Sequence, residues 1–200
     1  MNPAAQNTET LTTAPMPLVT AERYANAIME WLLPFCERIT TVGSIRRRRP
    51  MCGDVDLVLI PRFEIQRDLL GATIGRVNLV WKELVRYVAR SDGTAHWLAG
   101  EDRIDGRNYV LQLPKCQLDI FCARPKTWGT LVVCRTGSKE HNIWLASRAK
   151  SMGGHWDPYL GVLLHGQWQP VSTEEEVYRA VGLELIPPEK RELEYLRKLP

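Results

Sequence analysis

The segment at residues 54–60, D-V-D-L-V-L-I, is compatible with few structures. Its aliphatic and β-branched residues are typical of a buried strand, and Pro61 closes it. Because alternate residues of a strand face the same side, Asp54 and Asp56 project together, while Val55 and Leu57 face the opposite, apolar side. The segment therefore predicts a strand with a packed core behind it and a charged face in front of it.

Helices and strands alternate along the rest of the first half of the chain. Apolar residues at helical spacing predict a helix at residues 20–38, with Thr20 as its N-cap and Pro34 as a possible kink. Residues 64–88 are predicted to contain two helical stretches separated by Gly71 and Gly75, and residues 46–49 one helical turn. Strands are predicted at residues 39–42, 109–113 and 117–123. This order predicts an α+β fold in which a mixed sheet carries helices on one face.

A domain boundary is expected near Arg124 and Pro125. Beyond it, predicted helices at residues 128–134, 141–152 and 173–180, with short strands at 156–164 and 167–171, indicate a small α+β C-terminal domain. Residues 1–17 are rich in Thr, Ala and Asn without periodicity, which favours a disordered arm. We therefore expect domains at residues 18–124 and 125–192, followed by a charged tail at 193–200.

The overall composition is that of an ordinary soluble protein. The 200 residues carry a net charge of +3 and are 44% hydrophobic, and no apolar run is long enough to span a bilayer. The start lacks the pattern of a secretory signal. Five cysteines without a C-x-x-C pair argue against a disulfide framework or a zinc site. We expect a cytoplasmic protein without a membrane partner.

A third acid extends the charged face of the predicted strand. Asp119 lies in Q-L-D-I-F, an apolar and β-prone context that normally excludes a charge. Close carboxylates repel one another unless a cation lies between them, and hard oxygen ligands suit Mg²⁺. A bare D-x-D pair also occurs on ordinary exposed strands, and Asp102 and Asp105 lie in a glycine-rich turn where local hydrogen bonding explains them. The combination with Asp119 favours a metal site over that simpler interpretation.

A phosphate-binding turn is predicted ten positions before the acidic pair. Gly43 and Ser44 form a turn whose backbone N–H groups can hold phosphate. Arg46 and Arg47 follow directly and can neutralise a triphosphate, whereas Arg48 and Arg49 fit a solvated face better.

The arrangement G-S-I-R-R-R-R-P-M-C-G-D-V-D-L resembles the DNA polymerase X family of the polymerase β nucleotidyltransferase superfamily. Q-L-D-I-F-C-A resembles the family strand with the third catalytic Asp, T-G-S at residues 136–138 resembles its nucleotide-side turn, and the ending G-L through I-P-P-E-K-R-E is also similar. The resemblance covers roughly residues 19–192. It implies a nucleotidyltransferase palm followed by a small nucleotide-closing thumb, as in the smallest viral members, without the lyase domain and fingers of larger members.

The resemblance also implies roles for individual residues. Asp54 and Asp56 would hold two Mg²⁺ ions, with Mn²⁺ as a possible substitute, and Asp119 would hold the ion near the primer 3′-OH. Its implied nucleotide-binding residues are Gly43, Ser44, Arg46, Arg47, Gly53, Thr136, Gly137, Ser138 and Asn142. Its implied DNA-binding residues are Arg135, Lys139 and Arg148.

The chain departs from the family pattern beside the T-G-S turn. Cys134 and Arg135 replace two aromatic residues that help the family seat the sugar, so discrimination against ribonucleotides is open. Ala146 replaces an Arg that contacts the template in some relatives. His141 is expected to be exposed at the start of a helix.

The expected function is template-directed addition of dNMP to a primer 3′-OH in short-gap DNA repair. The expected partners are a primer-template or gapped duplex and dNTP, and the expected state is a monomer encoded by a bacterium, phage or other virus and nucleoid-associated when on DNA. Two alternatives stay open: a terminal transferase, or a nucleotidyltransferase for RNA, a small molecule or a protein. A non-catalytic DNA-binding module is a third interpretation, which retention of all three acids disfavours.

Overall fold

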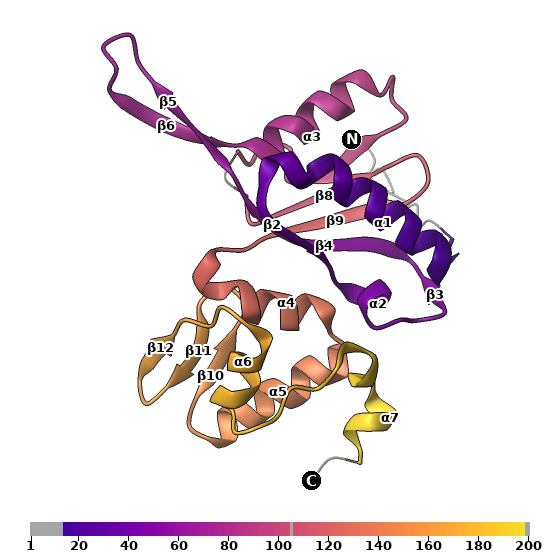
Figure 1. Cartoon of the computed structure of the whole chain (residues 1–200), viewed down its shortest axis with the longest axis vertical. Helices are drawn as coiled ribbons and strands as arrows, with labels where there is room; N and C mark the ends of the chain where they lie inside the picture. Colours follow the sequence, from indigo (N-terminus) through magenta and orange to yellow (C-terminus); the bar gives the residue numbers. More distant parts are fainter. Residues whose placement is uncertain (1–13, 105, 199–200) are drawn as a thin grey trace, which may run out of the picture.

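A five-stranded mixed sheet forms the centre of the N-terminal half of the molecule. The computed structural model describes residues 14–104 and 106–198. The sheet has the order β2–β4–β9–β8–β7, in which only β4 and β9 run parallel (Figure 1). The strands are β2 (Cys36–Thr41), β4 (Asp54–Pro61), β7 (His96–Ala99), β8 (Asn108–Gln112) and β9 (Gln117–Cys122). The predicted strands at 39–42, 55–60, 109–113 and 117–123 are confirmed, and β7 was not predicted.

Helices α1 (Leu18–Leu32) and α3 (Leu79–Arg90) cover one face of this sheet (Figure 1). The buried side of α1 carries Ala21, Ala25, Ile28 and Leu32, at the spacing of one helical face. The side chain of Asn78 caps α3 by accepting hydrogen bonds from two backbone N–H groups of its first turn. The prediction of an α+β fold with helices on one face is confirmed for this pair.

Local chain geometry corrects four sequence predictions. The first helix begins after Pro17, not at Thr20, and ends at Leu32, because Pro34 leads into the short 3₁₀ turn η1 (Leu33–Phe35) and then β2. The single turn α2 (Gly43–Arg46) begins at the glycine instead of at Arg46. Residues 63–78 form no helix. They form the hairpin of β5 (Phe63–Arg67) and β6 (Thr73–Asn78), which extends away from the body as a two-stranded ribbon (Figure 1).

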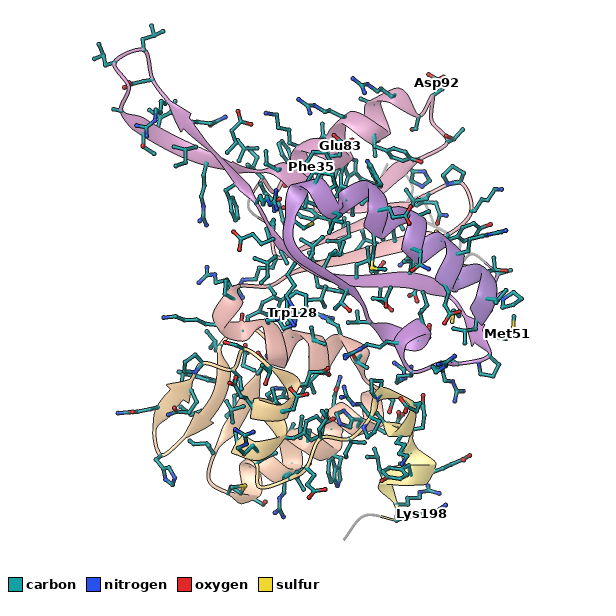
Figure 2. The ribbon with its side chains drawn as sticks, in the orientation of Figure 1. Phe35, Met51, Glu83, Asp92, Trp128 and Lys198 are labelled. Carbon is teal, nitrogen blue, oxygen red and sulfur yellow. The ribbon has the colours of Figure 1, made fainter. Side chains whose placement is uncertain are left out.

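The C-terminal half packs below the sheet through α4 (Trp128–Thr136). Trp128, labelled in Figure 2, packs with Leu131 and Val132 of α4 against Val58 and Phe121 of the sheet. A second core lies between the helices and the small antiparallel sheet β10–β11–β12. The other elements of this half are η2 (Pro125–Thr127), α5 (Lys139–Ser151), β10 (His155–Asp157), β11 (Gly161–Leu164), β12 (Gln167–Gln169), α6 (Glu174–Ala180), η3 (Pro188–Lys190) and α7 (Leu193–Leu196).

Both predicted tails are partly ordered. The predicted disordered arm falls mostly on residues 1–13, which lie outside the described residues, but β1 (Met16–Pro17) pairs with β3 (Met51–Cys52). At the other end, Leu196 of α7 is buried in the C-terminal core, so the segment after residue 192 is not a free tail. Within the described residues, no helix combines the length and the apolar character needed to cross a membrane.

Candidate active site

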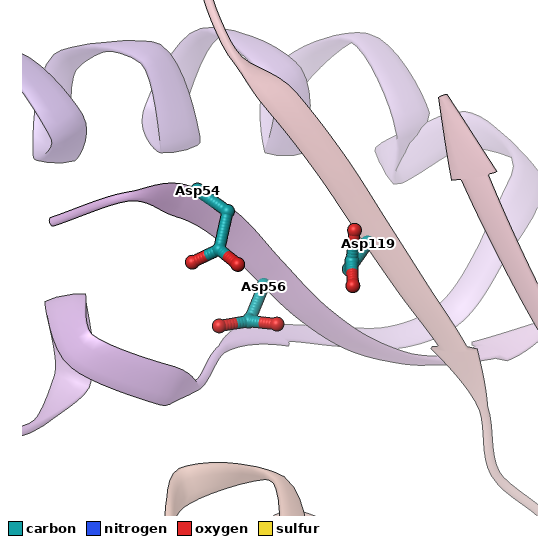
Figure 3. A group of neighbouring side chains, drawn as sticks. All are labelled: Asp54, Asp56 and Asp119. Carbon is teal, nitrogen blue, oxygen red and sulfur yellow. The ribbon is translucent and has the colours of Figure 1, made fainter. Parts of the chain in front are cut away.

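Three carboxylates gather on one face of the five-stranded sheet (Figure 3). Asp54 and Asp56 occupy alternate positions of β4, and Asp119 is the register partner of Asp56 on β9. Each offers an oxygen, and these oxygens all lie within 4.8 Å of one another. The same face continues as Val58 and Phe121, which pack against α4. Apolar packing at one end of the strands therefore fixes the register that brings the acids together at the other.

The acids resist being charged at the same time. Burial raises the pKa of Asp56 well above its ordinary value, and the charges of Asp54 and Asp119 raise it further. Burial also raises the pKa of Asp54 and that of Asp119, although Gln117 donates a 2.8 Å hydrogen bond to Asp119 that partly opposes the rise. Hard oxygen donors in mutual repulsion form a donor set that suits Mg²⁺ or Mn²⁺. The three residues therefore fit the expected metal ions.

Gly43 allows α2 to approach the acids closely. Its φ is +62°, and a Cβ atom there would lie only 1.9 Å from Oδ2 of Asp56. The backbone N–H of Val42 donates a 2.9 Å hydrogen bond to the carbonyl of Asp56. The hydroxyl of Ser44 is buried and has no hydrogen-bond partner among the described residues. Gly53 is exposed and leaves the space before Asp54 open. The predicted phosphate-binding turn thus lies directly beside the acids.

Arg46 and Arg47, predicted to neutralise a triphosphate, are paired with carboxylates of the C-terminal half. Arg46 donates to both oxygens of Glu174, one of them at 2.9 Å, and to the hydroxyl of Thr136 at 2.9 Å. Arg47 donates from Nε to Glu192 at 2.9 Å and from Nη1 to the carbonyl of Thr136. Their part in nucleotide binding stays a prediction, but they also join the two halves of the chain. Sequence reasoning did not find these partners.

The ion pair of Glu174 continues into the C-terminal core. Arg191 is fully buried and donates to Glu174 at 3.0 Å and to the carbonyl of Ile186 at 2.8 Å. Burial alone would raise the pKa of Glu174, but the hydrogen bond and charge of Arg46 and the charge of Arg191 hold it below its ordinary value. This carboxylate is therefore charged and held between two guanidinium groups.

The prediction of an exposed His141 is wrong. Its ring is buried, and Nε2 lies 2.6 Å from the hydroxyl of Tyr178. Burial lowers the pKa of His141 to about 4, and the positive charge of Arg191 adds to the effect. The signal that could have found this is the four-residue spacing from His141 through Leu145 to Ala149, which is one apolar helical face.

The T-G-S turn faces α2. Ser138 caps α5 by accepting a hydrogen bond from a backbone N–H of its first turn. Gly137 has a φ of +70°, and a Cβ atom there would lie 3.2 Å from Nη1 of Arg47. Asn142 donates a 2.7 Å hydrogen bond to the carbonyl of Cys134. The T-G-S turn and Asn142 therefore lie on one side of the contact between the two halves of the chain, and α2 lies on the other. We call this contact the seam.

The residues predicted to bind DNA lie in different environments. Arg135 is half-buried, its guanidinium lies 3.9 Å from the ring centroid of Phe121, and its Nε atom is buried without a partner among the described residues. Its charge partly offsets the rise that burial causes in the pKa of Asp119. Lys139 is exposed at the start of α5. Arg148 donates at 3.2 Å to a backbone carbonyl at the end of α6, so it already has a partner in the C-terminal half.

A groove between the two halves runs from Arg135 toward the small sheet. One cavity, of about 630 Å³, is lined by Arg135, Arg107 and Tyr159. A second, of about 930 Å³, shares Arg107 and Tyr159 and adds Lys126 and Trp168. The guanidinium of Arg107 lies 4.9 Å from the ring centroid of Tyr159, and Trp168 is 39% exposed. Positive charge, the half-buried ring of Tyr159 and the exposed ring of Trp168 thus line a path that begins at Arg135.

The fold is a mixed sheet that carries three clustered carboxylates, followed by a smaller α+β half. Residues 131–192 match the family model described as the DNA polymerase beta thumb. The fold is shared with polymerase beta of Leishmania infantum. The match to its ternary gap complex has a TM-score of 0.66 and 20% identity, covering 90% of this chain and 71% of that one. For its ternary P/T complex the values are 0.64 and 22%, covering 90% and 78%. A search of curated proteins gives no match.

At these identities the solved structures establish the fold alone. The thumb match adds a sequence-level relationship for the C-terminal half. The chain thus shares the fold of polymerase beta, and its residues 131–192 match the polymerase beta thumb.

Proposed function

We propose that this protein is a template-directed DNA polymerase that adds dNMP to a primer 3′-OH and fills short gaps in DNA repair. The observation that carries the proposal is the acidic trio, whose oxygens lie within 4.8 Å of one another. Two carboxylates on one strand are common, but the third comes from the neighbouring strand, and a glycine turn contacts the site from the side. The thumb match adds support from a separate part of the chain.

The chain contributes mainly positioning and charge to such a reaction. Two bound Mg²⁺ ions would lower the pKa of the primer hydroxyl and stabilise the leaving pyrophosphate. We propose that Asp54 and Asp56 hold both ions and that Asp119 holds the one near the primer end. The hydrogen bond from Gln117 orients the carboxylate of Asp119. Little covalent chemistry is required of the protein in phosphoryl transfer.

The nucleotide would occupy the seam between α2 and the T-G-S turn. The free hydroxyl of Ser44 can donate to a phosphate oxygen, and the guanidinium of Arg47 lies close enough to the acids to oppose the rise in the pKa of Asp54 and Asp56. Asn142 lies across the seam, bonded to a backbone carbonyl. These placements support a triphosphate that lies along α2 with its base toward α5.

The groove beside Arg135 supports a nucleic acid as the second substrate. Arg107 and Lys126 supply positive charge that attracts phosphates, while the exposed ring of Trp168 offers a surface on which a base can stack. The polymerase beta structures that share this fold are a ternary gap complex and a ternary P/T complex. All five cysteines are free, which supports the expected reducing, cytoplasmic compartment.

A transferase without a template is the alternative that one observation favours. Arg135 stands where relatives carry an aromatic residue that helps seat the sugar of the nucleotide, and its guanidinium lies over the ring of Phe121. The same site would serve a terminal transferase, or an enzyme that modifies RNA, a small molecule or a protein.

Primer extension separates these functions. The purified protein is incubated with Mg²⁺, the four dNTPs and a 5′-labelled primer, either in a gapped duplex or as a single strand. Template-matched extension in the gap is the expected result. Extension of the single strand alone would identify a terminal transferase, and the absence of extension on both would indicate an acceptor other than DNA.

Two variants provide the controls. Asp119→Ala should abolish extension, because it removes a metal ligand from the trio. Asp102→Ala removes the same charge from an exposed position outside the site and should leave extension unchanged. Equal activity of Asp119→Ala and wild type would contradict the assigned role of the trio.

A further inference from the structure

Arg47 has a carboxylate partner at the place where the proposed triphosphate would bind. Its Nε donates to Oε1 of Glu192 at 2.9 Å, and its Nη1 donates to the carbonyl of Thr136. Arg49 approaches the same oxygen of Glu192 at 3.8 Å. Glu192 directly follows the buried Arg191, and the segment around it is held by the C-terminal core. This carboxylate is therefore fixed in position and not simply a mobile surface group.

The ion pair of Arg47 with Glu192 is partly exposed to solvent. The side chain of Glu192 is 29% exposed and that of Arg47 is 17% exposed, so their contact is reachable from solvent. On the other side, Arg47 faces Gly137, where the nearest approach for a Cβ atom is 3.2 Å. A guanidinium has five N–H donors, and two bonds do not saturate it. A phosphate oxygen can therefore reach Arg47, but only beside or in place of the carboxylate of Glu192.

We propose that Glu192 is an anionic placeholder that competes with the substrate triphosphate for Arg47 and so sets the affinity of the site. The inference rests on the proposed function, because it requires a triphosphate at α2. A carboxylate beside the guanidinium neutralises it and repels a polyanion. The triphosphate must displace or tolerate this charge, which weakens its binding and couples it to the C-terminal segment that carries Glu192. Glu192 is thus a residue that determines affinity and not a catalytic one.

Glu192→Gln tests the proposal with little change of shape. The amide oxygen can still accept the hydrogen bond of Arg47, and the carbonyl of Thr136 still orients the guanidinium, so only the charge is lost. Charge-assisted bonds are about twice as strong as neutral ones, and we expect the variant to bind dATP about 3- to 10-fold more tightly. Binding is measured by isothermal titration calorimetry with Mg²⁺ and without DNA, so that no primer is present to react.

Matched variants separate competition from a structural effect. Glu194→Gln removes the same charge from an exposed position two residues away and should leave the affinity for dATP unchanged. Glu192→Asp keeps the charge and should restore weaker binding than Glu192→Gln. Inorganic tripolyphosphate should show the same preference as dATP, whereas deoxyadenosine, which has no phosphate, should not distinguish the variants. A general loosening of the fold would change the binding of all three ligands alike, so a difference confined to the two phosphate compounds indicates competition.

The outcomes also separate this inference from the proposed function. One outcome is that wild type binds dATP, that Arg47→Gln weakens this binding, and that Glu192→Gln leaves it unchanged or weaker. The proposed competition by Glu192 is then wrong, and the triphosphate site at Arg47 is retained. Equal tightening in Glu194→Gln would likewise overturn the proposal, because general electrostatics would then explain it. If dATP binds to neither wild type nor Glu192→Gln, both the triphosphate site and the placeholder are wrong.

Discussion

The acidic trio and the arginine residues of the seam differ in whether their charges are paired within the chain. Asp54, Asp56 and Asp119 lie together with no described cationic side chain in an ion pair with them, and burial raises the pKa of each. A few residues away, Arg46 and Arg47 are each bonded to a carboxylate from the C-terminal half. One region keeps like charges close, and the other matches opposite charges across the molecule.

The difference separates charges that are paired within the chain from charges that are not. Matched pairs such as Arg46 with Glu174 satisfy one another and connect the two halves. Close carboxylates repel one another when all are charged, and either a shared proton, as between Asp54 and Asp56, or a bound cation relieves this repulsion. The trio is therefore the part of the molecule whose arrangement suits a bound cation, and the ion pairs of Arg46 and Arg47 are the part that joins the two halves of the chain.

Neutralising the trio should have the largest effect on function and should not cost stability. Asp56→Asn should lower the rate of primer extension by roughly a thousandfold or more, because it removes charge that acts on the transition state. A raised pKa in the folded state means that the ionised carboxyl costs stability at neutral pH, and that this cost is relieved as pH falls through the raised pKa. In EDTA the variant should therefore unfold in urea at the same or a higher concentration than wild type. A marked loss of stability in EDTA would show that groups of the chain itself stabilise the charged carboxyl of Asp56.

Gly43 is where the two regions touch, and Gly43→Ala should disturb both. The new Cβ would overlap Oδ2 of Asp56 at 1.9 Å, in a backbone conformation with φ of +62° that alanine rarely adopts. We expect a loss of about 3–4 kcal/mol in the free energy of unfolding, measured by urea denaturation. Gly53→Ala is the stability control, because no atom lies within 4 Å of its Cβ position. Similar losses in both variants would contradict the close approach to Asp56.

Breaking the seam should cost stability where breaking the trio does not. Glu174→Gln leaves Arg191, which is 0% exposed, and Arg46 without their shared carboxylate. Loss of one partner from a buried pair costs about 3 kcal/mol, and the same denaturation assay measures it. Glu175→Gln, at the exposed neighbouring position, should change stability by less than about 0.5 kcal/mol. A neutral result for Glu174→Gln would mean that the seam does not hold the two halves together.

The smallest predicted effect is on how the free energy of unfolding depends on pH. His141 is buried and neutral with a pKa of about 4, against an ordinary value of 6.5. The unfolded chain gains a proton as pH falls below 6.5 while the folded chain does not until about 4, so stability is lost across this window. Between pH 7 and pH 5 this residue should account for a loss of about 2 kcal/mol.

The contribution of His141 is isolated by comparing variants. His141→Gln should be less stable than wild type at pH 7, because the contact with Tyr178 is altered, but its stability should fall less between pH 7 and pH 5. The carboxyls of the trio have the opposite sign and are present in both proteins, so they cancel in the difference. Parallel pH profiles would show that His141 gains its proton as readily in the folded state as in the unfolded one.

The sequence predicted the trio because local patterns encode it. Alternation around Asp54 and Asp56 and the apolar context of Asp119 each indicate a strand with one charged face, and pairing of these two strands follows from burying their apolar residues. The glycine turn was predicted for the same reason, although α2 begins at Gly43 and not at Arg46.

The seam could not be predicted because its partners are distant in sequence. Arg46 and Glu174 are 128 residues apart, and Arg47 and Glu192 are 145 apart, so no local pattern joins them. The β5–β6 hairpin was missed for a different reason. Its strands are mostly exposed, so the apolar alternation of a half-buried strand is weak there. Gly71 and Gly75 resemble helix breaks in the sequence, but they lie in the turn and in β6. The burial of His141 depends on α5 packing against Tyr178, and the spacing of His141, Leu145 and Ala149 indicates the buried face but not this partner.

Direct measurement of metal binding tests whether the trio is a cation site. Mn²⁺ is titrated into the wild-type protein without nucleotide or DNA, free Mn²⁺ is followed by electron paramagnetic resonance, and Mg²⁺ is added as a competitor. We expect saturable binding that Mg²⁺ displaces, that is at least about tenfold weaker in Asp56→Asn, and that is unchanged in Asp102→Asn. Equal Mn²⁺ binding by wild type and Asp56→Asn, or no binding by wild type, would contradict the assignment of Asp54, Asp56 and Asp119 as the metal ligands.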